Sequence, residues 1–75
     1  MKVTYDEEAD ALYMTLQEAE YYESDEIKEG LIIDYDEKGN VVGIEIVGAS
    51  TYLDQEDLST VNFEINHKLA NTSDK

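Results

Sequence analysis

The residues of this sequence most able to do chemistry are carboxylates, and one stretch of them fits the register of a calcium loop. Positions 1, 3, 6, 8 and 12 of that register hold Asp34, Asp36, Gly39, Val41 and Glu45. Carboxylate oxygens are the hard ligands that Ca²⁺ prefers, and the glycine allows the sharp turn. Against this, Lys38 puts a cation at position 5, where a ligand belongs, and both flanks are strand-like rather than helical. We interpret the stretch as an acidic hairpin and expect no metal site.

Other catalytic chemistry has little to work with in this chain. His67 is the only imidazole and lies in a polar C-terminal segment, and the absence of cysteine excludes a disulfide framework, a thiolate zinc site and a cysteine nucleophile. No serine has the Gly-x-Ser-x-Gly context that activates a nucleophile, and no lysine follows the glycines as a phosphate-binding loop requires. Because no nucleophile–base pair is visible, we expect a protein that is not an enzyme and holds no cofactor.

The charge balance narrows the range of partners. Nineteen acidic residues face five basic ones, and the net charge is −14. This charge repels phosphate backbones, so we expect no nucleic-acid binding, whereas a basic protein would be attracted. The chain has no apolar run long enough to span a membrane and no signal-peptide pattern at Met1, so we expect a cytoplasmic protein without a membrane segment.

The acidic residues are densest between Gln17 and Gly30, where six carboxylates accompany the single lysine Lys28. Like charges three residues apart oppose a helix, so we predict an irregular connection, extended around residues 21–27 and closing at Gly30. This stretch is the candidate docking surface for a basic partner, with two tyrosines as amphipathic anchors. The candidate residues are Glu18, Glu20, Tyr21, Tyr22, Glu23, Asp25 and Glu26. The alternative interpretation is a solvated loop, because charge runs usually face water.

The elements that must position these residues centre on one predicted β-hairpin. Two β-branched, apolar runs, residues 31–35 and 41–47, flank the turn sequence of residues 37–40. One face of this hairpin is apolar throughout, while the second face mixes apolar and acidic residues. We expect either the C-terminal segment or a second copy of the protein to cover the second face. Gly43, inside a strand, indicates a bulge or a close backbone approach.

The rest of the chain is predicted to add strands to this hairpin. Residues 2–5 and 11–16 alternate or share faces as two further strands, joined as a hairpin, with Val3 and Tyr5 turned inward. Residues 51–58 are expected to hold a short helical turn, and residues 59–66 alternate cleanly enough to predict a fifth strand. The fold class is therefore mainly β, a small antiparallel meander of four to five strands with a short helix near the C-terminus. We expect a single domain over residues 1–66 and a frayed tail over residues 67–75.

Two runs of the sequence resemble a known family. They read VTYDEEADALY at residues 3–13 and GLIIDYDEKGNVVGIEI at residues 30–46, and they are similar to the small prokaryotic proteins of domain of unknown function 2283. No catalytic residues are established for that family, so the resemblance implies none here. It does imply an antitoxin-like role, because some relatives look like antitoxin partners of basic, RNA-cleaving proteins. The chain lacks the basic DNA-binding segment of many antitoxins, so self-regulation at an operator is not expected.

Three hypotheses of function follow. The first is a non-enzymatic protein-binding module that holds a basic partner through residues 18–29 and the acidic hairpin turn. The second is a structural protein that self-associates as a homodimer through a sheet face or a strand edge. The third is a carboxylate metal site around Asp34, Asp36 and Glu45.

Overall fold

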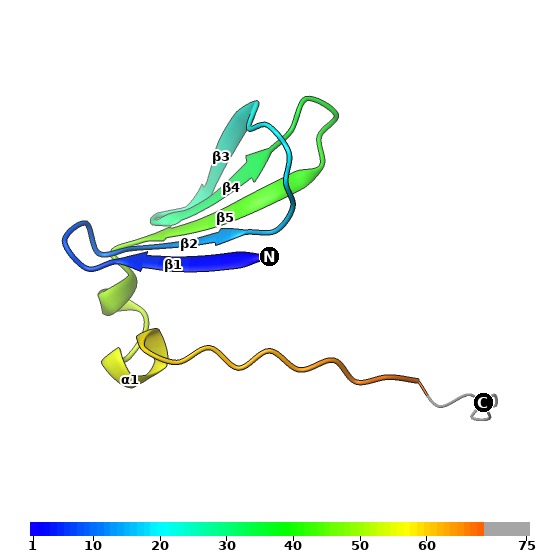
Figure 1. Cartoon of the computed structure of the whole chain (residues 1–75). Coiled ribbons are helices and arrows are strands. Elements are labelled where there is room, and N and C mark those ends of the chain that lie inside the picture. Colours follow the sequence, from blue (N-terminus) through cyan, green and yellow to red (C-terminus); the bar gives the residue numbers. More distant parts are fainter. Residues whose placement is uncertain (69–75) are drawn as a thin grey trace.

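The computed structural model describes residues 1–68, and its main element is one five-stranded antiparallel sheet (Figure 1). The prediction of a mainly β antiparallel fold is confirmed. The strands are β1 (Lys2–Asp6), β2 (Ala11–Thr15), β3 (Glu23–Lys28), β4 (Leu31–Tyr35) and β5 (Val41–Val47). A 3₁₀ turn, η1 (Ala49–Thr51), and one turn of helix, α1 (Gln55–Leu58), follow the sheet, and α1 lies within the segment where a short helix was expected.

The strand order across the sheet is β1-β2-β5-β4-β3. The β1–β2 hairpin therefore joins the β3–β4–β5 meander through pairing of β2 with β5, with Met14 opposite Ile44. After β2 the chain crosses to the far edge of the sheet before it forms β3. This order leaves β1 and β3 as the two edge strands, so each has a row of backbone groups that no other strand of the sheet pairs.

The central hairpin of β4 and β5 forms as predicted. Its turn is closed by the Asp36 N–H, which donates to the Asn40 carbonyl oxygen over 2.9 Å. The Asp36 carboxylate accepts hydrogen bonds from the backbone N–H groups of Lys38 and Asn40, at 3.0 and 2.8 Å. Gly39 takes φ +86°, which a residue with a side chain adopts only with strain.

The third strand in chain order arises from the acidic stretch. Repulsion between carboxylates disfavours a compact helix, and the extended backbone places successive side chains on opposite faces. Gly30, at φ +85°, turns the chain directly back into β4. Residues 23–28 form the strand and the predicted closure at Gly30 is confirmed, although the pattern had indicated an extended connection rather than a paired strand.

The C-terminal segment runs beneath the sheet (Figure 1). The residues between the two show that it covers the apolar face, not the second face, for which it was one of two expected covers. A hollow of about 250 Å³ separates the two, lined on the sheet side by apolar residues of β1 and β2 and on the other by the C-terminal segment. The apolar lining residues are Val3, Tyr5, Leu12, Met14, Leu53, Leu58 and Val61. Among residues 1–68 only Val42 and Ala49 are buried apolar residues, so the core is shallow.

The predicted fifth strand at residues 59–66 is wrong. This segment is extended but pairs with no strand, and all its residues are exposed. Alternation at period two identifies a sequence that suits a one-sided strand, but it does not provide an edge to pair with. The predicted tail divides: residues 67–68 have no regular structure, and residues 69–75 lie outside the described residues.

Candidate partner-binding surface

The candidate surface is built on edge strand β3, whose six residues are all exposed. Glu23 lies opposite Tyr35 and Asp25 opposite Ile33, so these two carboxylates share the apolar face of the sheet. Glu26 lies opposite Ile32 and so faces the other side. Carboxylates therefore flank the edge on both faces, and the outward backbone groups between them face no other strand.

The connection before β3 extends this surface. Every residue from 17 to 22 is exposed, and the Tyr22 N–H donates to the Tyr35 carbonyl oxygen over 2.8 Å, which holds the connection against β4. Tyr21 and Tyr22 are 62% and 59% exposed, so most of each ring contacts solvent. The Tyr21 hydroxyl lies 3.0 Å from the Ser24 hydroxyl, which anchors that ring to the start of β3.

The hairpin turn of β4–β5 lies beside this connection, although the two are separate in the sequence. A hollow of about 380 Å³ is lined by Ala19, Glu20, Tyr21 and Tyr22 from the connection and by Asp36, Glu37, Lys38 and Asn40 from the turn. The Asn40 N–H, as the main cause, lowers the pKa of the Asp36 carboxyl below its usual range. Asp36 therefore keeps its negative charge at neutral pH beside Glu20 and Glu37.

The seven predicted partner-binding residues thus occupy one edge of the sheet. All of them are exposed. Glu26 also has a local structural role, because its carboxylate accepts a hydrogen bond from the Gly30 N–H over 3.1 Å. We name the surface formed by residues 18–28 together with the turn residues 36–38 the acidic edge.

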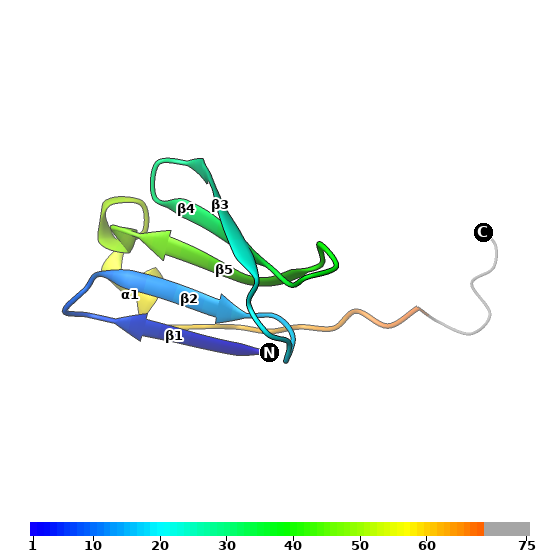
Figure 2. The same ribbon diagram turned by 90° about the horizontal axis from the view of Figure 1, so that it is seen from above.

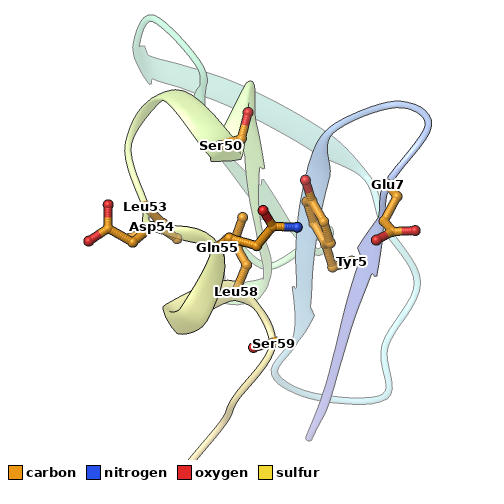
Figure 3. A pocket seen from close by; sticks show the side chains of 8 residues that line it. All are labelled: Tyr5, Glu7, Ser50, Leu53, Asp54, Gln55, Leu58 and Ser59. Atoms are coloured by element: carbon orange, nitrogen blue, oxygen red, sulfur yellow. The ribbon is translucent and has the colours of Figure 1, made fainter.

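A second hollow, of about 480 Å³, lies at the other end of the molecule between the β1–β2 turn and the C-terminal segment. Figure 3 shows Gln55 pointing toward the Tyr5 ring, while Asp54 points away from the hollow. Beside it, the Tyr5 hydroxyl donates to Asp10 over 2.6 Å, and the Ser50 hydroxyl and N–H donate to the same carboxylate over 2.7 and 3.0 Å.

These bonds fasten η1 to the β1–β2 turn. The hydrogen bond from Tyr5, followed by those from Ser50, lowers the pKa of the Asp10 carboxyl. A carboxylate stabilised in this way is a weak base, so the arrangement holds Ser50 in place rather than activating it. Sequence reasoning missed this contact, because forty residues separate Asp10 from Ser50 and the family resemblance implies no role for either residue.

A third cluster lies on the second face of the sheet, where the Tyr13 hydroxyl donates to the buried Asp34 carboxylate over 2.8 Å. The hydrogen bond to Asp34 is the main reason that the pKa of Tyr13 rises to about 12. The bond to Asp10 likewise raises the pKa of Tyr5 to about 12.

Both shifts predict late ionisation of tyrosine. The chain has six tyrosines, and titration by tyrosinate absorbance should show Tyr5 and Tyr13 ionising near pH 12 in the folded protein. Their folded pKa exceeds the unfolded value of about 10, so the stability they contribute is complete below pH 10 and is lost as the pH rises toward 12. Asp10→Asn should remove the late step of Tyr5 and leave that of Tyr13. An unchanged late ionisation of Tyr5 in the Asp10→Asn variant would contradict this assignment.

The calcium register does not converge in space. Asp34 turns into the sheet toward Tyr13, whereas Asp36 satisfies the hairpin turn. Within residues 1–68 no group of three or more His, Cys, Asp or Glu side chains is placed to hold a metal ion. His67 is exposed and lines none of the three hollows described above.

One comparison with known proteins gives a match, and that match covers the part of the chain that forms the sheet. Neither the curated proteins nor the solved structures contain a match to this chain. No helix in the described part of the chain is long and apolar enough to cross a membrane. Residues 2–50, which cover all five strands, match the family described as Protein of unknown function (DUF2283). The match spans both resembling sequence runs, and the chain belongs to the DUF2283 family.

Proposed function

We propose that this protein is a non-enzymatic binding module that holds a basic protein partner on its acidic edge, in the manner of an antitoxin. The observation that carries the proposal is the exposed edge strand β3, with carboxylates on both faces and a row of outward backbone groups. An added strand of a partner would pair with that backbone edge. Basic side chains flanking the added strand would meet Glu23, Asp25 and Glu26.

The two exposed tyrosines provide a large contact area that carboxylates do not. Tyrosine buries a large ring at small entropic cost and is enriched among residues that dominate binding energy. Tyr21 and Tyr22 directly precede β3 and line the hollow shared with the hairpin turn. A partner that covers the acidic edge would therefore desolvate both rings, while the carboxylates accelerate its association.

An experiment separates this proposal from a merely solvated surface. Tagged protein is used to capture partners from its native host at low and at high salt, and the captured protein is identified by mass spectrometry. We expect a small basic protein that is lost at high salt, because screening weakens the attraction. The triple variant Glu20→Gln/Glu23→Gln/Asp25→Asn should weaken its binding about tenfold, from roughly 0.5 kcal/mol per rim charge.

The matched control removes the same charge elsewhere. Glu7→Gln/Glu8→Gln/Glu56→Gln neutralises three exposed carboxylates at the opposite end of the molecule. This variant should bind the partner with nearly wild-type affinity. Equal loss from both triple variants would mean that only net charge matters, and capture of no basic protein at low salt would refute the proposal.

A further inference from the structure

One segment of the described chain has no partner. Residues 60–68, which we name the C-terminal arm, run beneath the β1–β2 side of the sheet and then beyond it (Figures 1 and 2). The alternating residues Val61, Phe63 and Ile65 are 67%, 70% and 63% exposed. No backbone hydrogen bond joins the arm to the rest of residues 1–68. Three large apolar side chains in a row therefore contact water.

The apolar face of the sheet is also incompletely covered. No large side chain among residues 1–68 is fully buried, and a hollow lies between this face and the start of the arm. The radius of gyration is 15.7 Å, against about 11 Å for a compact domain of this length. The arm, which runs beyond the sheet, contributes to the difference (Figure 1).

We infer that this chain forms a dimer in which the arm of each copy lies along β1 of the other. The arm would extend the partner's sheet by one strand. Its apolar side chains would then continue the face formed by Val3 and Tyr5, while Asn62 and Glu64 would face the polar side with Thr4. The arm is long enough, because its nine residues span about 30 Å and the five of β1 about 17 Å.

The charges on the two edge strands favour β1 over β3 as the strand with which the arm pairs. β1 carries Lys2 and Asp6, which balance, whereas β3 carries three carboxylates and one lysine. The alternating part of the arm, residues 61–66, holds one charged residue, Glu64, which the carboxylates of β3 would repel. Pairing at β1 also leaves the acidic edge open on the opposite side of the sheet, so this inference does not rest on the proposed function.

The arm does not pair with β1 of its own chain. Val61 lies across a hollow from its own β1 and β2, beneath the face rather than at the edge. Phe63 and Ile65 are then left exposed. A two-fold arrangement of two copies pairs both arms through the same contacts, as closed dimers require.

The first test is the mass in solution. Light scattering across a dilution series should give about 17 kDa, twice the 8.5 kDa of one chain. Phe63→Ser/Ile65→Ser should give the monomer mass and keep the β-sheet circular dichroism signal of the five strands β1–β5, because neither residue belongs to them. The control Asn62→Ser/Asn66→Ser, on the polar side of the arm, should remain dimeric. A wild-type monomer at all concentrations, or a dimer that survives loss of Phe63 and Ile65, would overturn the inference.

A second test determines whose β1 the arm meets. The chain has no cysteine, so Thr4→Cys/Asn62→Cys introduces the only two thiols, on the same side of the paired strands. Oxidation should give a covalent dimer on a denaturing gel that reducing agent separates. An internal disulfide within a monomer would show that the arm folds onto its own β1, and absence of any disulfide would place the arm elsewhere. Either result would overturn the inference that the arm of each copy lies along β1 of the other.

Discussion

Replacing Gly30 by alanine should cost about 3 kcal/mol of unfolding free energy, from left-handed strain of about 1–2 kcal/mol and overpacking of about 1–3 kcal/mol. Gly30 has φ +85°, and an added Cβ would lie 2.7 Å from the Val47 carbonyl oxygen. That oxygen belongs to the backbone of β5, which cannot move aside like a flexible side chain. The Val47 N–H donates to the Gly30 carbonyl oxygen over 2.8 Å, so the two backbones are fixed at close range.

A matched control separates crowding from strain. Gly39 has φ +86°, yet an added Cβ there would meet nothing within 4 Å. Gly39→Ala should therefore cost only the strain, about 1–2 kcal/mol. Urea unfolding of both variants at equal concentration measures the two losses, with equal slopes required for the comparison. Equal losses would show that the approach of Val47 does not constrain residue 30.

The effect of Gly30→Ala reaches past the β3–β4 turn. The same Cβ would lie 3.3 Å from the Tyr52 ring and hydroxyl, and that hydroxyl donates to the Glu29 carbonyl oxygen over 2.8 Å. Tyr52 thus fixes the segment after η1 to the turn before β4. Since a chain of 75 residues has a total stability of about 4–11 kcal/mol, a loss of this size would leave it close to unfolding.

Local sequence chemistry predicted much of this sheet. The central hairpin could be identified because its two apolar runs flank a turn that needs a glycine, and both strands formed with the predicted bounds. Residues 23–28 were harder to assign, because carboxylates at close spacing argue against a helix without arguing for a paired strand. Their pairing depends on Gly30, which returns the chain at once to β4 and makes the hairpin local.

The arm shows the limit of periodicity. Val61, Phe63 and Ile65 alternate as well as any strand in the sheet, yet the described chain offers them no paired edge. A segment becomes part of a sheet only when it pairs with a second segment, and the alternation of apolar residues does not identify that second segment. The acidic edge could be located from composition, whereas its junction with the hairpin turn required the fold that brings Glu20 beside Asp36.

Gly43 is the one position where a local signal pointed to a distant contact. The expected bulge lies next to it, where the β4–β5 register shifts between Asp34 and Tyr35, and the close approach comes from a side chain, because an added Cβ would lie 2.6 Å from the Tyr13 hydroxyl. The Tyr13 ring crosses β5 at this glycine to reach Asp34 on β4. Gly43 is opposite Asp34 in β4 and opposite Thr15 in β2, and Tyr13 lies two residues before Thr15 on the same face. The sequence indicated a close contact at Gly43 but did not show that the Tyr13 side chain makes it.

Tyr13→Phe should therefore be the most costly loss of a single hydroxyl in the sheet. Asp34 is only 5% exposed, and the Tyr13 hydroxyl, 2.8 Å away, is its side-chain partner. Hydrogen bonds to charged groups contribute about 1.5–3 kcal/mol, and a buried acceptor that loses its donor also keeps its desolvation penalty. We expect a loss of about 2 kcal/mol at neutral pH. Tyr21→Phe, which removes an exposed hydroxyl, should cost less than about 0.5 kcal/mol.

A double-mutant cycle tests whether that loss belongs to the pair. In the Asp34→Asn background the acceptor is neutral, so the further cost of Tyr13→Phe should fall to about 1 kcal/mol or less, as for a neutral hydrogen bond. Chemical unfolding of the four proteins gives the coupling energy directly. Additive losses would mean that Tyr13 stabilises the sheet through its ring over Gly43 and not through its hydroxyl. A positive coupling would show that the hydroxyl is what allows a carboxylate to be buried in the middle of this sheet, and would explain why a glycine lies between them.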